Sequence, residues 1–135
     1  MRTVAIANNM NKRILVIEDT TSFRRLIRMT LEFDGFTVIE AEDGTKGLAL
    51  AQTEDVDLIL LDLMLPGISG LEVCKQIRSS FRLRDTPIVL LSSSEDSNDI
   101  EACLQAGAKD YLMKPFRPPM LLDVIYKHIG ATVKK

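Results

Sequence analysis

The sequence predicts an α/β domain in which a parallel sheet is covered by helices on both faces. Five short apolar runs alternate with five stretches whose apolar residues recur at helical spacing. The central run ends in Asp62 and then breaks at Pro66-Gly67, which can continue neither a strand nor a helix. Strict alternation of this kind favours parallel strands joined by right-handed crossovers, and such a sheet needs helices on both faces.

Each predicted strand is short and rich in β-branched and aliphatic side chains. Arg13 begins the first, and the unbroken apolar run that follows indicates a central strand buried on both faces. The second contains Thr37 and Glu40 and is expected to be more exposed. In order, the predicted strands are residues 13–17, 36–41, 58–62, 87–91 and 109–113.

The predicted helices lie between the strands and are bounded by capping signals. Residues 20–22, two threonines and a serine, offer N-caps for the first helix, and Gly35 ends it. The others are expected from about residue 45 to 52, from about 69, from 98 to 106, and from 118, where two prolines can start a helix.

Length and charge limit the classes of protein to which the chain can belong. It has 135 residues, which fits about one domain. Lys plus Arg total 17 against 19 for Asp plus Glu, so there is no basic field, and direct nucleic-acid binding is not expected. No apolar run approaches the ~20 residues that cross a bilayer, and residues 1–10 lack a sustained apolar signal region. We therefore expect a cytoplasmic protein that does not interact with membranes.

The folded domain is expected to span residues 12–130, between an irregular N-terminal extension of residues 1–11 and a tail of residues 131–135. Cys74 and Cys103 each fall on an apolar helix position. They are interpreted as reduced packing residues, and not as a disulfide or a metal-binding pair.

Chemically active side chains follow four of the predicted strands at the point where each strand ends: Glu18-Asp19, Asp62, Ser92 and Lys114. The carboxyl ends of parallel strands share one edge of the sheet, and ligands of open α/β sheets bind at that edge. Each residue alone has an ordinary explanation, such as a helix cap, a turn former or a surface charge. Their arrangement at successive strand ends favours a common site instead.

The residue types at this edge point to phosphoryl chemistry. Three carboxylates held close together repel one another unless a cation joins them or one takes up a proton, and oxygen ligands of this kind suit Mg²⁺. Lys114 adds a positive charge, and Ser92 adds a hydroxyl donor. Such a pocket could hold a phosphoryl group on Asp62, whose carboxylate would be the nucleophile.

With these motifs, the chain resembles the receiver domain of two-component response regulators, the CheY-like family. The motifs occur in the family's order: the acidic pair Glu18-Asp19, the phosphoacceptor stretch at 60–70, the hydroxyl-bearing strand at 87–92 and the closing motif at 106–116. The resemblance covers about residues 12–129. It implies a doubly wound (βα)5 flavodoxin-like fold with strand order 2-1-3-4-5.

The resemblance also implies roles for the acidic residues. Asp62 would accept a phosphoryl group from a phosphohistidine on a sensor histidine kinase or a histidine phosphotransfer protein. Asp19, Asp62 and the backbone carbonyl of Met64 would hold Mg²⁺, with Glu18 acting through water. A domain of this kind catalyses only its own phosphorylation and a slow dephosphorylation, and it is not otherwise an enzyme.

Further roles implied by the resemblance concern switching. Ser92 and Lys114 would contact the phosphoryl oxygens, and Tyr111 would swing inward when Ser92 moves toward the phosphate. The face made by the fourth helix, fifth strand and fifth helix would then control a downstream partner or an output domain, and the resemblance allows a phosphorylation-dependent homodimer. The bond between Lys114 and Pro115 is expected to be cis, as in the family.

Two positions depart from the family pattern, and two others bear on the lifetime of the phosphate. Ser92 stands where Thr is usual, and Thr20 follows the acidic pair where many members have an acid or Asn. Met64 and Ser94 occupy the family positions whose side chains place water for hydrolysis. Because Met64 is apolar and Ser94 is short, the phosphorylated form is expected to be long-lived.

Three other functions fit part of the pattern. A phosphatase-like hydrolase with an aspartate nucleophile and Mg²⁺ would need a second acid two residues after Asp62, where the chain has Met64. A flavin binder could use residues 20–22 as a phosphate cradle, but Glu18 and Asp19 would repel the phosphate. A docking module that is never phosphorylated stays open, although the complete set of site residues argues against it.

Overall fold

The computed structural model of the protein describes residues 12–93 and 97–129. Within them, one sheet contains β1 (Arg13–Ile17), β2 (Thr37–Ala41), β3 (Leu58–Asp62), β4 (Ile88–Ser92) and β5 (Asp110–Met113). The helices that alternate with these strands are α2 (Thr21–Phe33), α3 (Gly44–Thr53), α4 (Gly70–Ser79), α5 (Ser97–Gln105) and α6 (Pro118–Ile129). A short 3-10 helix, η1 (Phe81–Leu83), precedes β4.

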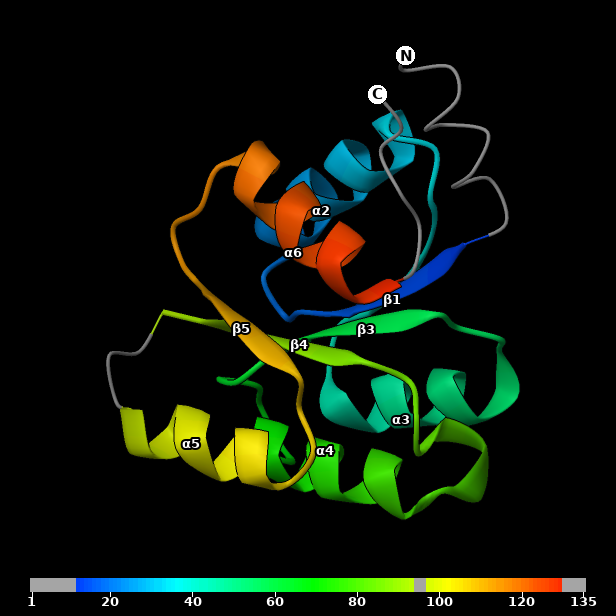
Figure 1. The fold of residues 1–135 in the computed structure, drawn as a ribbon, viewed down its shortest axis with the longest axis vertical. Coiled ribbons are helices and arrows are strands. Elements are labelled where there is room, and N and C mark those ends of the chain that lie inside the picture. Colours follow the sequence, from blue (N-terminus) through cyan, green and yellow to red (C-terminus); the bar gives the residue numbers. More distant parts are fainter. Residues whose placement is uncertain (1–11, 94–96, 130–135) are drawn as a thin grey trace.

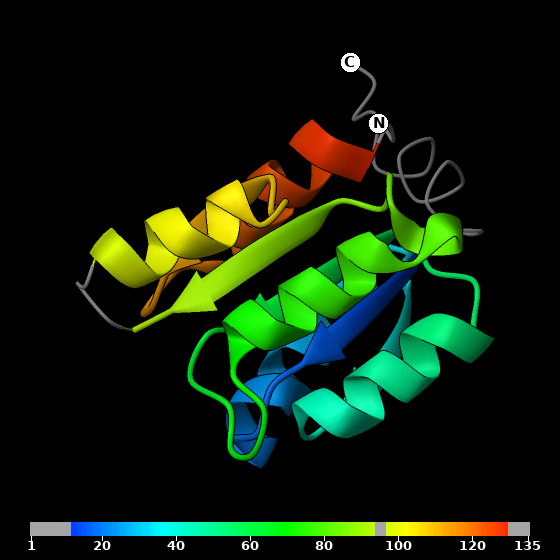
Figure 2. The same ribbon diagram turned by 90° about the horizontal axis from the view of Figure 1, so that it is seen from below.

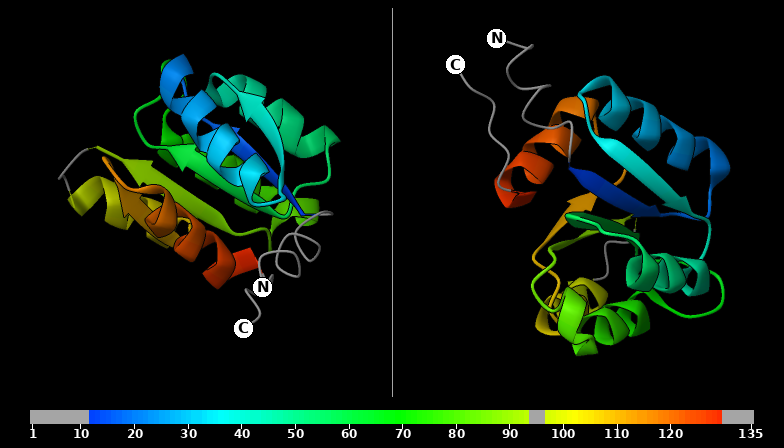
Figure 3. Two further views of the ribbon diagram at one scale, coloured as in Figure 1. Left: turned by 90° about the horizontal axis from the view of Figure 1, so that it is seen from above. Right: turned by 90° about the vertical axis from the view of Figure 1, so that its right-hand side faces the viewer.

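The strand order is β2-β1-β3-β4-β5, and every neighbouring pair is parallel. This confirms the doubly wound flavodoxin-like fold and its order. Figure 1 shows α2 and α6 on one face of the sheet and α3, α4 and α5 on the other, and the right-hand view of Figure 3 shows the same three layers from the side. In Figure 2 the arrowheads of β1 and β4 point the same way, so their carboxyl ends lie at one edge.

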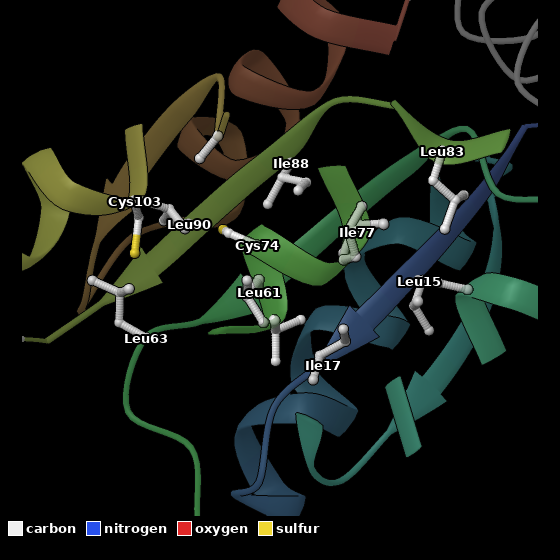
Figure 4. Packing of buried hydrophobic residues seen from close by; sticks show 14 of the residues in the cluster. Leu15, Ile17, Leu61, Leu63, Cys74, Ile77, Leu83, Ile88, Leu90 and Cys103 are labelled. Atoms are coloured by element: carbon white, nitrogen blue, oxygen red, sulfur yellow. The ribbon is translucent and has the colours of Figure 1, made fainter. Parts of the chain in front are cut away.

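Successive residues of the central strands face opposite sides of the sheet, so each strand contributes to two apolar cores. In β1, Leu15 and Ile17 belong to the first core, which lies against α3, α4 and α5 and is drawn in Figure 4. Ile14 and Val16 belong to the second core, which lies against α2 and α6. Burial on both faces explains why the central runs are apolar at every position.

Element boundaries fall close to those predicted, and the differences have local causes. β2 begins at Thr37 and not at Phe36, because the buried Phe36 donates its N–H to the carbonyl of Leu31 at the end of α2. The expectation of a hydroxyl cap for α2 is wrong, since the N-cap Thr20 makes no capping bond through its side chain. Sequence patterns also did not predict η1.

Cys74 and Cys103 are buried free thiols in the first core, as their apolar positions predicted. Burial raises the pKa of Cys74 to about 12.

None of the described helices combines the length and the apolar character needed to cross a membrane. The predicted extension at 1–11 and tail at 131–135 lie outside the described residues, so the domain boundaries stay predictions.

Helix α3 approaches β1 closely at Gly47. A Cβ atom at this position would lie 2.5 Å from Cδ1 and 2.8 Å from Cγ1 of Ile17, nearer than side chains ordinarily approach. Ile17 ends β1 and directly precedes Glu18, so this contact also supports the start of the polar edge.

We expect Gly47→Ala to lower the free energy of unfolding by about 1 kcal/mol, because overpacking, typically about 1–3 kcal/mol, outweighs a helix-propensity gain of about 1 kcal/mol. Urea denaturation measures the change. Thr45→Ala, at an exposed position of the same helix, is the matched control and should leave stability equal or slightly higher. A gain in stability for Gly47→Ala would contradict the close packing.

Candidate functional site

The sheet register brings the predicted site residues to one edge, at the left of Figure 1. Asp62 ends β3 and pairs with Leu91, while Ser92 ends β4 and pairs with Met113. The N–H of Lys114 then donates to the carbonyl of Ser92 at 2.8 Å, which extends the ladder one residue past β5.

Three carboxylates gather at this edge. Glu18, Asp19 and Asp62 each offer an oxygen that lies within 4.8 Å of the others. Glu18 is fully buried and Asp62 is 2% exposed, whereas Asp19 is exposed. The cluster therefore has two members enclosed by protein and one that faces solvent.

The ammonium group of Lys114 joins the two buried acids. Its Nζ donates to Oε1 of Glu18 at 2.9 Å and to Oδ2 of Asp62 at 3.2 Å. The Lys114 side chain is only 18% exposed, so solvent screens these contacts less than it would screen a surface pair.

Backbone donors hold the remaining carboxylate oxygens. The N–H of Thr20 donates to Oε2 of Glu18 at 3.1 Å, and the N–H of Met64 donates to Oδ1 of Asp62 at 3.0 Å. Each buried carboxylate thus accepts one hydrogen bond from a main-chain N–H and one from Lys114. Both carboxylates are fixed in orientation before any ligand arrives.

The charges of the site are not balanced. Burial raises the pKa of Glu18 above its ordinary value, and the charge of Asp62 adds to the rise, while bonds from Lys114 and Thr20 offset it only in part. Burial alone lowers the pKa of Lys114, but the bonds and charges of Glu18 and Asp62 outweigh burial, and its pKa is raised. One cation for three acids leaves negative charge that a second cation would relieve.

Mg²⁺ fits this donor set. It prefers hard oxygen ligands, uses one or two protein carboxylates at a time, and keeps several waters. The clustered oxygens supply the carboxylates, and the exposed Asp19 leaves one side open to water.

The other predicted site residues are placed as follows. Ser92 is fully buried at the end of β4, and Tyr111 on β5 is 43% exposed. Met64 is 62% exposed, beside the acid cluster. The bond between Lys114 and Pro115 is cis. Ser94 lies outside the described residues.

Sequence reasoning missed two neighbours of the site. Arg24 donates from Nη1 to the carbonyl of Glu18 at 2.7 Å and pairs through Nε with Glu40 at 2.8 Å. The ring of Phe23 lies against Lys114, with Nζ 4.7 Å from its centre. Both residues belong to the first turns of α2, directly after the acidic pair, and this proximity in sequence was the available signal.

Comparison with known protein families matches residues 14–126 to the response regulator receiver domain. The alkaline phosphatase synthesis transcriptional regulatory protein PhoP of Bacillus subtilis is 45% identical over 109 residues, which cover 81% of this chain and 45% of PhoP. The DNA-binding response regulator MtrA of Mycobacterium tuberculosis is 39% identical over 85% of this chain and 49% of MtrA. The chain thus spans about half the length of these curated relatives.

Solved structures show the same similarity. The receiver domain of the sensor histidine kinase PA1611 from Pseudomonas aeruginosa superposes with a TM-score of 0.82 at 34% identity, over 88% of this chain and 98% of that chain. That structure has a magnesium ion coordinated in its active-site cleft.

We expect Lys114→Met to lower the free energy of unfolding at pH 7 by roughly 2 kcal/mol, less than the 3–5 kcal/mol typical of a broken buried ion pair because Asp19 leaves the edge open to water. The loss should be smaller at pH 5. Lys114 lowers the pKa of Glu18, so removing it raises that pKa further above the unfolded value. A group whose pKa is raised in the folded state loses stability as pH rises through its folded value, and this loss is larger in the variant than in wild type.

Urea denaturation in chelator-treated buffer at both pH values tests this. Lys109→Met, at an exposed position, is the control and should have little effect at either pH. An equal loss for Lys114→Met at pH 5 and pH 7 would argue against Lys114 as the partner of the buried acids.

Proposed function

The chain belongs to the response regulator receiver domains, and on that basis we propose that it acts as a phosphorylation-controlled switch in which Asp62 is the phosphoacceptor. Receiver domains are signalling domains and do not turn over a separate substrate. We propose that this one catalyses only its own phosphorylation and a slow loss of the phosphate.

The observation that carries the proposal is the meeting of three acids and one ammonium at the carboxyl edge of the sheet. Asp62 ends β3, which lies in the sheet between β1, the strand before the other two acids, and β5, the strand before Lys114. Its carboxylate is held in a fixed orientation by the N–H of Met64 and by Lys114. In the transfer, a carboxylate oxygen of Asp62 forms a bond to phosphorus while the bond from phosphorus to the donor's imidazole nitrogen breaks, and the electron pair leaves with the donor. Lys114 offsets negative charge on the phosphoryl oxygens.

We propose Mg²⁺ as the cofactor, held by Asp19, Asp62 and the backbone carbonyl of Met64, with Glu18 acting through water. When bound, the ion would neutralise charge on the acids and the incoming phosphoryl group. The clustered oxygens support this assignment, as does the magnesium ion in the PA1611 receiver domain.

The proposed switch links Ser92 to Tyr111. The hydroxyl of Ser92 would move toward a phosphate on Asp62, and the Tyr111 ring would move inward to fill the space that is vacated. The partly exposed position of Tyr111 supports this idea, because the ring has room to become more buried. The surface altered would be the face of α5, β5 and α6.

The proposed partners follow from this role. The phosphoryl donor would be a sensor histidine kinase or a histidine phosphotransfer protein, met in the cytoplasm, and the receiver of the signal would be a downstream protein, an output domain or a second copy of the chain. A phosphatase-like hydrolase is not favoured, because Met64 carries a thioether that cannot protonate a leaving group.

Asp62→Asn should abolish phosphoryl uptake, because the amide is not a nucleophile at this position. Acetyl phosphate with Mg²⁺ as donor and intact-protein mass as readout test this directly. Asp85→Asn changes an exposed acid just before β4, at the opposite edge, and should behave like wild type. Uptake by Asp62→Asn at the wild-type rate would refute the assignment.

Asp19→Asn should weaken Mg²⁺ binding at least about tenfold, since even outer-shell partners of a metal site typically contribute about that much. Isothermal titration calorimetry measures the affinity. Asp99→Asn removes an equal charge from the first turn of α5 and should leave the affinity nearly unchanged. Equal losses in both variants would indicate a bulk charge effect in place of direct coordination.

The double variant Met64→Asn, Ser94→Glu should lose phosphate faster than wild type, because its amide and carboxylate can orient the attacking water. The decay of phosphorylated protein is followed after the donor is removed. The control Met64→Leu, which keeps an apolar side chain of similar size, should keep the wild-type lifetime. If the double variant decays no faster, these two side chains do not set the lifetime.

A further inference from the structure

The ammonium group of Lys114 has an aromatic neighbour in addition to its two carboxylates. Its Nζ lies 4.7 Å from the centre of the Phe23 ring. An ammonium carries three N–H donors, of which Glu18 and Asp62 account for two. A cation within about 6 Å of a ring centre is attracted by the negative face of the π system. Phe23 therefore helps to position the ammonium group of Lys114.

The ring is held in place by its own packing. Phe23 meets Phe116 with ring centres 5.4 Å apart and an interplanar angle of 64°, an edge arrangement that aromatic pairs favour. Both rings pack against the second core. Phe23 comes from α2, whereas Lys114 and Phe116 follow β5, so the contact joins two separate segments of the chain.

We propose that Phe23 is a positioning residue for the phosphorylation of Asp62, acting through Lys114. This inference rests on the proposed function. When the phosphoryl group joins Asp62, Lys114 must exchange its bond to Oδ2 of Asp62 for contacts with phosphoryl oxygens. Hydrogen bonds require fixed directions, but attraction to the face of a ring tolerates a small shift of the cation. The ring keeps the ammonium group at the acid cluster while the hydrogen-bond partners of Lys114 change.

Simple apolar packing is the competing explanation, and ring electronics separate the two. Fluorination of the ring preserves its shape and burial but withdraws electron density from its face, so it weakens attraction for a cation. Phe23→Leu removes the face altogether, whereas Phe23→Tyr and Phe23→Trp retain one. A role in packing alone would follow side-chain size, and a role in positioning the cation would follow the electron density of the ring.

The experiment places phenylalanine, 4-fluoro-, 3,5-difluoro- or 3,4,5-trifluorophenylalanine at position 23 of the full chain. The rate of phosphoryl uptake from acetyl phosphate, which releases acetate, is measured at fixed Mg²⁺ concentration by intact-protein mass. We expect the rate to fall with each fluorine, by about two- to fivefold for the trifluoro ring, as the usual strength of a cation–π contact implies. Phe23→Leu should fall at least as far, and Phe23→Tyr should stay near wild type.

Two further readouts isolate the effect. In wild type, the side-chain protons of Lys114 should show an upfield ring-current shift by NMR that Phe23→Leu removes. Mg²⁺ affinity should stay within about twofold of wild type throughout, since the ring acts on Lys114, which is not a proposed metal ligand. The same fluorinated residues at Phe36, a buried ring that packs against Tyr126, should leave the rate unchanged.

The outcomes distinguish this inference from the function on which it rests. Equal uptake rates across the fluorinated series, or a Lys114 signal without a ring-current shift, would overturn the positioning role while leaving phosphorylation of Asp62 intact. A wild-type chain that takes up no phosphoryl group would overturn the proposed function, and the positioning role with it.

Discussion

Two buried carboxylates share one ammonium group, and the arrangement of the whole carboxyl edge depends on this interaction. Glu18 follows β1, Asp62 ends β3 and Lys114 follows β5, so the contact reaches across β4 and joins three strand ends. Without the cation, the two acids would be buried beside each other with only backbone donors to offset their repulsion. The N–H groups of Thr20 and Met64 orient the two carboxylates but do not neutralise their charge.

The opposite edge of the sheet is stabilised in a different way. The guanidinium of Arg78 donates to the carbonyls of Gly107, Leu83 and Thr86, and that of Arg82 reaches carbonyls at the end of α3. These carbonyls are neutral acceptors, and the acids of this edge are paired with arginines: Arg82 with Asp55 at 3.0 Å and Arg13 with Glu54 at 2.8 Å. The arginines of this edge thus find their hydrogen-bond acceptors within the protein, whereas the carboxyl edge keeps an excess of negative charge that a bound cation can relieve.

The strands and the acid cluster could be predicted from the sequence because each central strand is buried on both faces. A doubly buried strand is a continuous apolar run, and the polar residue that stops it marks the strand end. Phe23 was not recognised as part of the site: its place soon after the acidic pair was the available signal, but its spacing is that of any core residue. Thr20 does not cap α2 through its hydroxyl, and its own N–H is bonded to the carboxylate of Glu18.

The alternation of β3 between two cores restricts how the length of the chain can vary. Leu58 and Leu60 face one core, while Ile59 and Leu61 face the other. Deleting one residue from this strand would exchange the two sets and turn every side chain to the wrong layer. It would also draw Asp62 back by one strand residue, about 3.3 Å, which is as long as its bond to Lys114. Insertions and deletions among related chains should therefore be confined to the loops, while β3 keeps a constant number of residues.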